Sequence, residues 1–540
     1  MIAKILNKNT WFAALFLYTA VFHGAYFLGP LIVLNIFFLA SLFLHRADIK
    51  IDITALLMLL LLAVMVFSWL LFSLSPHEGL VEVVKYALFP LAYIYFTSIH
   101  TNKSDDIFYK VFILIMVFGL LGVLGISPLP GMTAPLTGRL QSFVGYPNTA
   151  ALVMGIGAFY ATEKFKQTKS KPQLILLAAF AAGLILTLSR VTFVTFAVIY
   201  LLYIFPAVSL KIKLAATSGL AAIWGILALF DSRIINISLF APTLVERYIS
   251  YFDALGIMLL HPLGLGVSNW QFMQFYYQSA PYSVRFIHNF YLQIGLDGGF
   301  LALGIVLALL ALALLKGKRN VHFYIILFIL SGAFFEVHFN FGLIIVYFAY
   351  ALASIKPPEG GFGIAIAGQK MKIARYAFLL PILPLAVLFT AHAFYNTGAR
   401  HEISGNSREA YMAYANSLRL NRLNAGALHF AMGRNSPDFE TAIHHLESAH
   451  NLNPWDTSVI FSLAQGHLHS GGLDDAYFFG NMLLDKFPLS TRNQELLHSI
   501  ARARPAPYSA QSLAALEMRI SDINAGINSL YRHIDYYFRY

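Results

Sequence analysis

The residues of this chain best suited to chemistry are a histidine and several arginines that stand at the ends of long apolar segments. His288 and Arg285 lie in "RFIHNFYLQIGLDGG", directly before one of the most apolar stretches. A histidine can accept a proton near neutral pH, and the arginine fork binds phosphate oxygens in pairs. These residue types suit a site for a lipid phosphate or diphosphate, provided that they face the same side of a membrane.

Composition identifies the class of protein that must position these residues. Hydrophobic residues make up 58% of the 540 and charged residues only 12%, whereas a soluble chain would carry roughly twice that charge. Apolar runs long enough to cross a bilayer recur along the chain. We therefore predict an all-α polytopic membrane protein with spans at 11–28, 29–44, 53–74, 83–99, 107–126, 147–162, 173–189, 191–207, 213–230, 290–315, 321–336, 340–355 and 375–395.

The connectors between these spans predict the orientation, because Lys and Arg concentrate on the cytoplasmic side. Lysine occurs in the N-terminal segment and in every even-numbered connector: "HRADIK", "TNKSDD", "EKFKQTKSKP", "KIK", "KGKRN" and "KPPEGG…GQKMK". The odd-numbered connectors hold Lys85 at a predicted helix start and otherwise only arginines, Arg139, Arg190, Arg233, Arg247 and Arg285. The odd-numbered connectors, and His288 with them, are predicted to face outward from a bacterial inner membrane.

Two interpretations of the external arginines stay open at this point. They can bind a phosphate or diphosphate, or they can anchor helix ends to the headgroups of membrane lipids and pair with Glu246 and Asp253. Arg190 fits simple anchoring least well, because "LTLSRVTF" places it between two apolar runs with almost no loop. A charge at that depth is costly and usually functional.

Two predicted external segments are long enough to build a site, residues 127–146 and the large loop 231–289. The large loop begins with the helical pattern "TLVERYISYFDALGIMLL", continues through a turn in "HPLGLGVSNWQF", and ends in the aromatic stretch "FYYQSAPYSVRFIHNF". Its tyrosines can anchor the loop at the membrane surface, or they can stack on sugar rings.

Several other chemistries lack their motifs. The chain has no GxxxxGK[ST] loop for nucleotide phosphates, and the external acids Asp231, Glu246, Asp253 and Glu336 are too scattered for a metal motif. The span interiors are almost free of acids, which disfavours an ion-coupled transporter. Much of the net charge of +11 is the orientation signal, so no nucleic-acid partner is needed. We expect neither a metal nor a cofactor.

Four segments occur in the order found in the O-antigen ligase superfamily: "TGRLQSFVGYPNTAALVMG", "LTLSRVTFV", "ERYISYFDALGIMLLHPLGLGVSNWQF" and "HNFYLQIGLDGGFLALG". The chain resembles that group of GT-C-type membrane glycosyltransferases over roughly residues 50–355. The group includes lipopolysaccharide O-antigen ligases, protein O-oligosaccharyltransferases and, more distantly, O-antigen polymerases. One departure is Asp297, which stands where the family pattern has glutamate.

The resemblance implies roles for individual residues. Arg190 and Arg247, with Arg139 or Arg285, would bind the diphosphate of an undecaprenyl-diphosphate-linked glycan and stabilise the charge that develops on it. His288 would act as the base for the acceptor hydroxyl, although a headgroup-facing or helix-capping histidine is the alternative. The remaining motif positions are Pro147, Asn148, Asn289 and Gln293.

The chain changes character near residue 396, so we predict a membrane domain over 1–395 and an external helical domain over 396–540. Pro454 and Pro488 are separated by the 34-residue period of a tetratricopeptide repeat. Such repeats generally bind other proteins on a concave surface. The histidines of this domain lack firm spacing for metal ligands.

The sequence as a whole favours a glycosyltransferase that moves a preassembled glycan to a hydroxyl of a protein or of lipid A–core. The alternatives are a polymerase that extends a polyprenyl-linked glycan and, outside enzymes, a membrane scaffold that recruits partners through its repeats. A scaffold would not require His288, and a polymerase would lengthen the lipid-linked glycan where a ligase would deplete it.

Overall fold

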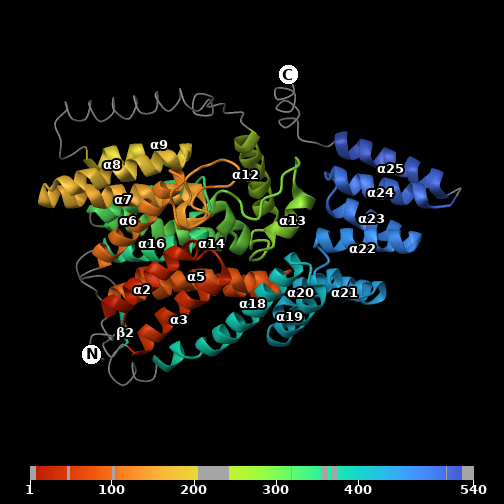
Figure 1. Ribbon diagram of the computed structural model, residues 1–540, viewed down its shortest axis with the longest axis horizontal. Helices are drawn as coiled ribbons and strands as arrows, with labels where there is room; N and C mark the ends of the chain where they lie inside the picture. Colours follow the sequence, from red (N-terminus) through yellow and green to blue (C-terminus); the bar gives the residue numbers. More distant parts are fainter. Residues whose placement is uncertain are drawn as a thin grey trace.

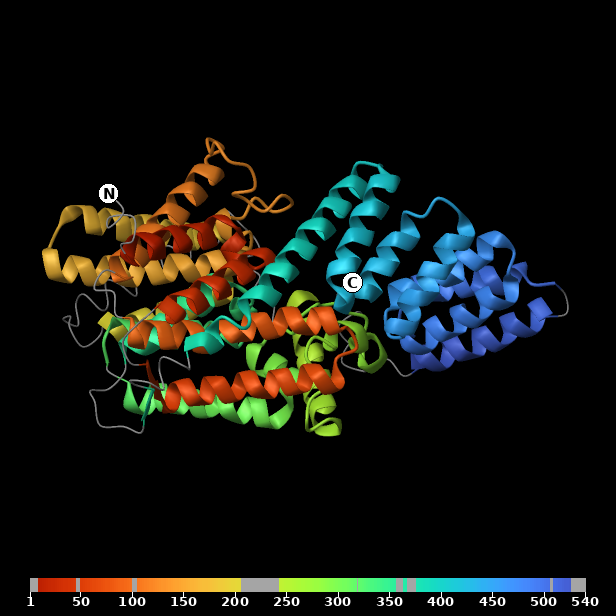
Figure 2. The same cartoon turned by 90° about the horizontal axis from the view of Figure 1, so that it is seen from below.

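A computed structural model of the chain describes residues 8–44, 49–99, 104–204, 242–317, 319–355, 363–366, 375–505 and 508–525. These residues are almost entirely helical (Figures 1 and 2). The apolar part contains α2 (Lys8–Val21), α3 (Leu28–Leu44), α4 (Ile53–Phe72), α5 (Pro76–Ser98), α6 (Ser104–Val123), α7 (Pro147–Thr168), α8 (Lys171–Leu186), α9 (Arg190–Ile204), α12 (Pro242–Leu260), α13 (Trp270–Tyr277), α14 (Phe290–Lys316), α15 (Val321–Ala333), α16 (Gly342–Ser354) and α18 (Ile382–Ile403). The protein is an all-α polytopic membrane protein, as predicted.

Local sequence explains where several of these helices begin. Asp52 caps α4, because its side chain accepts a hydrogen bond from the backbone amide of Ala55 at 2.9 Å. Proline stands at the start of α5, α7 and α8, where its missing N–H costs no helical hydrogen bond. Helix α14 is interrupted at Gly298 and Gly299, whose backbone dihedrals are not helical.

Five helical segments within the described residues are long and apolar enough to cross a membrane: Ile53–Phe72, Pro76–Ser98, Ser104–Val123, Phe290–Leu315 and Arg375–Ile403. Six shorter apolar helices accompany them. Every predicted span overlaps a described helix or helical segment except 213–230, which lies outside the described residues together with Arg233. One boundary was wrong: α5 begins at Pro76, so Lys85 lies inside this helix rather than at its start.

The connectors meet at two opposite ends of the bundle. At one end, Tyr160 and Tyr350 both donate to the carboxylate of Asp105, at 2.7 and 2.8 Å. At the other end, Tyr146 from the connector before α7 and His288 from the connector before α14 both contact Glu336, which lies between α15 and α16. We call these the Asp105 end and the His288 end.

Two short strands, β1 (Ile49–Asp52) and β2 (Gly363–Ile366), form an antiparallel pair. Ile49 lies opposite Ile366 and Asp52 opposite Gly363. The pair joins the connector before α4 to the connector after α16. Two even-numbered connectors are therefore in contact, as the predicted alternation of sides requires.

Helix α18 runs through residue 395, the predicted domain boundary, without a break. It leads into α19 (Ser407–Leu420), α20 (Ala425–Arg434), α21 (Phe439–Leu452), α22 (Thr457–Ser470), α23 (Leu473–Lys486), α24 (Thr491–Ala503) and α25 (Tyr508–Ala525). Successive helices of this series pack against each other beyond the His288 end of the bundle (Figures 1 and 2). The arrangement fits a helical-repeat architecture, and the tetratricopeptide assignment stays a prediction.

Candidate functional site

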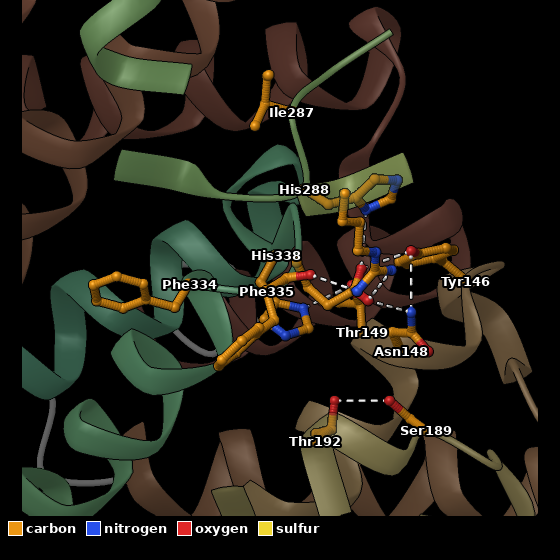
Figure 3. A network of polar contacts seen from close by, with 12 residues as sticks. Tyr146, Asn148, Thr149, Ser189, Thr192, Ile287, His288, Phe334, Phe335 and His338 are labelled. Carbon is orange, nitrogen blue, oxygen red and sulfur yellow. Dashed lines mark hydrogen bonds and ion pairs between the residues drawn. The ribbon is translucent and has the colours of Figure 1, made fainter. Parts of the chain in front are cut away.

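A buried carboxylate, Glu336, holds the His288 end together. Arg247 and Asn148 both donate to its Oε1, at 2.8 and 2.6 Å. Tyr146 donates to Oε2 at 2.7 Å, and Nδ1 of His288 lies 3.4 Å from the same oxygen. Four donors, two from the connectors before α7 and α14 and two from helices α7 and α12, therefore converge on one side chain (Figure 3).

Glu336 is ionised in this setting. Burial opposes its charge, but the hydrogen bond from His288 and the positive charge of Arg247 outweigh burial and lower the pKa of Glu336 to about 2. The nearby His338 is buried, and desolvation lowers its pKa to about 4, so it is neutral at pH 7. Its Nδ1 lies 3.1 Å from Oγ1 of Thr149. The negative charge of Glu336 is thus compensated by Arg247 rather than by His338.

The carboxylate defines the tautomer of His288. An ionised carboxylate can only accept hydrogen bonds, so the Nδ1 atom that faces Glu336 must carry a proton. In the neutral imidazole, Nε2 is then the basic nitrogen. Figure 3 shows the second ring nitrogen of His288 directed away from the Glu336 cluster. A separation of 3.4 Å is long for a hydrogen bond, so this is the longest of the four contacts to Glu336.

Asn289 and Gln293 position His288 through the backbone. The Asn289 side chain caps α14 by accepting from the amides of Tyr291 and Leu292, at 3.0 and 3.1 Å. Gln293 accepts from the amide of Ile287 at 3.0 Å. Tyr251 of α12 donates to the carbonyl oxygen of His288 in a short hydrogen bond. These contacts fix both neighbours of His288 and its own carbonyl group.

Arg139, Pro147 and Asn148 also meet at this end of the bundle. Pro147 is the first residue of α7, and the Asn148 that follows it accepts from Nη2 of Arg139 at 2.7 Å. Nε of Arg139 donates to the carbonyl oxygen of Thr187 at 2.7 Å. Arg139 is therefore linked to Glu336 through the Asn148 amide.

The two remaining predicted arginines occupy different places. Arg190 is the first residue of α9, and its neighbour Ser189 donates to Thr192 at 2.8 Å, in a pair that Figure 3 draws apart from the contacts around Tyr146 and His288. Arg285 pairs with Glu78 of α5 at 2.6 Å, and its side chain is half exposed. The structure thus brings Arg247 and Arg139 to the Glu336 cluster and pairs Arg285 with a different carboxylate.

A cavity of about 410 Å³ opens on His288. Its walls come from the turn between α2 and α3, from the segment before α7 and from the end of the large loop; the lining includes His23, Tyr26, Tyr146, Ser283, Arg285, Phe286 and Phe341. Gly145 is required here, because a Cβ atom would lie 2.6 Å from Nδ1 of His23 and the backbone has φ +71°. The cavity gives a ligand access to His288.

Reasoning from sequence missed Glu336 and Tyr146. Glu336 appeared there only as one of several scattered external acids. A signal was present in "FFEVHFN", where an acid and a histidine two residues apart separate two apolar segments. Within the described residues, no group of three or more His, Asp or Glu side chains is placed to hold a metal ion.

One comparison with known proteins matches part of the chain. A family model described as O-antigen ligase matches residues 175–307, a region that contains Arg190, Arg247 and His288. No curated protein matches the chain. The match supports a membrane glycosyltransferase of the O-antigen ligase or polymerase type, and it confirms over residues 175–307 the resemblance to the O-antigen ligase superfamily.

Proposed function

We propose that the protein transfers a preassembled glycan from undecaprenyl diphosphate to an acceptor hydroxyl on the outer side of the bacterial inner membrane. The observation that carries this proposal is the contact of His288 with the ionised Glu336 beside an open cavity. A histidine held in this way can act as a general base, because its Nε2 is left basic.

In the proposed reaction, the acceptor oxygen forms a bond to C1 of the first sugar while the bond from C1 to the diphosphate oxygen breaks. The acceptor proton passes to Nε2 of His288, and the electron pair of the broken bond leaves with the diphosphate. Glu336 stabilises the resulting imidazolium through Nδ1. A diphosphate is already a good leaving group, so it needs neutralisation by positive charge rather than a proton.

Arginines supply that positive charge. The guanidinium of Arg247 carries five N–H donors, so it can hold Glu336 and a phosphate oxygen together. Arg139 donates to Asn148 at the start of α7 and to the carbonyl oxygen of Thr187. Arg190 follows Thr187 by three residues, as the first residue of α9. We assign these arginines to the donor diphosphate, while Arg285, which lines the cavity, is paired with Glu78.

The acceptor side involves the helical C-terminal part. A further cavity of about 450 Å³ lies between α13 and helices α20, α22 and α24, and it shares Ser283 with the cavity at His288. Phe275 of α13 stacks on Phe487, with ring centroids 4.1 Å apart, and so couples the loop that carries His288 to the repeat helices. A protein acceptor or lipid A–core that docks here would be close to the base.

The test is a set of transfer and binding measurements on His288→Ala, Arg190→Lys and Arg247→Lys with a labelled polyprenyl-diphosphate glycan. His288→Ala should bind the donor nearly normally and lose about 10² to 10⁴ in turnover, the range for removal of a general base. The lysine variants keep the charge but lose the paired hydrogen bonds, so donor binding and turnover should fall together. Normal turnover by correctly folded His288→Ala protein would refute the proposed mechanism.

A further inference from the structure

A second, smaller cavity of about 230 Å³ adjoins the cavity at His288. The two cavities share Tyr26, Phe27, Arg285 and Phe286 in their walls. The smaller cavity extends from this shared wall toward α5, α18 and the start of α20. Unlike the larger cavity, it is lined by neither His288 nor Tyr146.

Several side chains that line this cavity are polar although they are buried. Glu82, Lys85 and Asn340 all line it, with exposed fractions of 4%, 5% and 9%. Lys85 forms an ion pair with Glu82 and donates to Oδ1 of Asn340 at 2.8 Å. The side-chain nitrogen of Asn340 is buried and makes no hydrogen bond. A buried donor without a partner destabilises the fold unless a ligand or an ordered water satisfies it.

The charges that line the cavity balance. Glu78 and Glu82 carry two negative charges, and Lys85 and Arg285 carry two positive charges. A phosphate would favour a net positive site and a metal ion a net negative one. The balance favours a neutral ligand that both donates and accepts hydrogen bonds.

The other walls are aromatic. Tyr26, Phe27, Phe286 and Tyr395 line the same cavity, and aromatic faces with a few fixed polar groups are typical of small-molecule pockets. Sugar rings combine apolar C–H faces with hydroxyl groups that donate and accept. We propose that this cavity is a saccharide subsite, which binds a sugar beyond the one that reacts at His288.

This inference rests on the proposed function and adds to it a recognition site for the glycan. The sugar can come from the donor, as a unit beyond the reacting one, or from an acceptor that is itself a glycan. In either case, binding energy from this remote unit would help to orient the reacting groups, and its loss would lower turnover as well as affinity.

Two variants test the subsite. Ala427→Trp introduces an indole from an exposed position at the cavity wall, and Ala427→Ser is the matched control that leaves the space open. Asn340→Asp keeps the shape of the side chain and the acceptor for Lys85, but it replaces the unpartnered donor with a carboxylate oxygen, which adds a negative charge next to Lys85. The probes are polyprenyl diphosphates that carry either one sugar or the full glycan, and the free oligosaccharide released from the donor.

If the subsite binds donor sugars, Ala427→Trp and Asn340→Asp should lower kcat/KM for the full-glycan donor by about tenfold, equivalent to about 1.4 kcal/mol. The single-sugar donor should be used at the wild-type rate, which also shows that the variants are folded. If the subsite binds acceptor sugars, the loss should appear instead with an oligosaccharide acceptor and a single-sugar donor. In both cases, binding of the free oligosaccharide should weaken by a similar factor.

The subsite proposal would be overturned if both variants used every donor and acceptor at the wild-type rate and bound the free oligosaccharide with unchanged affinity. That outcome is distinct from failure of the proposed function, which is tested by His288→Ala. If His288→Ala is inactive but Ala427→Trp and Asn340→Asp behave as the wild type, the proposed transfer reaction stands and only the subsite proposal is refuted.

Discussion

Replacement of Glu336 by glutamine tests the acid–base assignment most directly, because it removes one charge without a change in shape. Arg247 and Asn148 both donate to Oε1. If the glutamine NH2 group replaced Oε1, it would face two donors, one of them charged. The glutamine should therefore place its NH2 group at the Oε2 position, facing Tyr146 and His288.

This orientation has a defined consequence for His288. The hydroxyl of Tyr146 can rotate and accept a hydrogen bond, but Nδ1 of His288 can accept only without its proton. The proton of a neutral ring then moves to Nε2, the atom that must receive the acceptor proton. Loss of the correct tautomer should reduce kcat by about 10² to 10⁴, comparable to loss of the base itself.

The assay compares Glu336→Gln with a matched control, Glu246→Gln, in purified protein. Glu246 is an exposed carboxylate on α12, one residue before Arg247. The control should transfer glycan at the wild-type rate, and both variants should bind labelled donor nearly normally. A Glu336→Gln enzyme within about threefold of the wild-type rate would falsify the tautomer argument, since that argument predicts at least a hundredfold loss. A parallel loss of donor binding would instead place Glu336 in the donor site.

The remaining predictions concern pH, topology and the acceptor. Because the pKa of Glu336 is lowered to about 2, its stabilising contribution is complete above the ordinary carboxyl range and is lost only as the pH falls toward 2; the difference in melting temperature between the wild type and Glu336→Gln should therefore stay constant below neutral pH and change only as the pH falls toward 2. The chain contains no cysteine, so a single cysteine at the exposed Ser458 should react with an impermeant reagent in intact spheroplasts and one at the exposed Thr168 should not; the reverse pattern would contradict the predicted orientation. Removal of residues 404–540, which follow the end of α18, should slow transfer to the native acceptor more than cleavage of the donor by water. Equal rates of acceptor transfer by truncated and full-length protein would exclude a docking role for the repeats.

The local sequence determined the positions of the apolar helices, the starts of several of them and the motif around His288. Apolar runs predict spans because the backbone must satisfy its own hydrogen bonds within lipid, and the described helices overlap those runs. Pro147 at the start of α7 and the Asn289 cap of α14 are likewise local features. The motif around His288 identified the histidine and the residues that hold its backbone, because these contacts lie within a few positions along the chain.

Only the tertiary structure decided which groups act together. Glu336 is 48 positions from His288, 89 from Arg247 and 188 from Asn148, and it meets all three at one end of the bundle. The start of α5 at Pro76 was missed because polar residues lower the hydropathy of its first turns. In the structure, one of these polar residues, the buried Lys85, is stabilised by Glu82 and by Asn340 from a distant connector. Such pairings depend on how the helices pack, and neither the periodicity of one segment nor the charge of one connector carries that information.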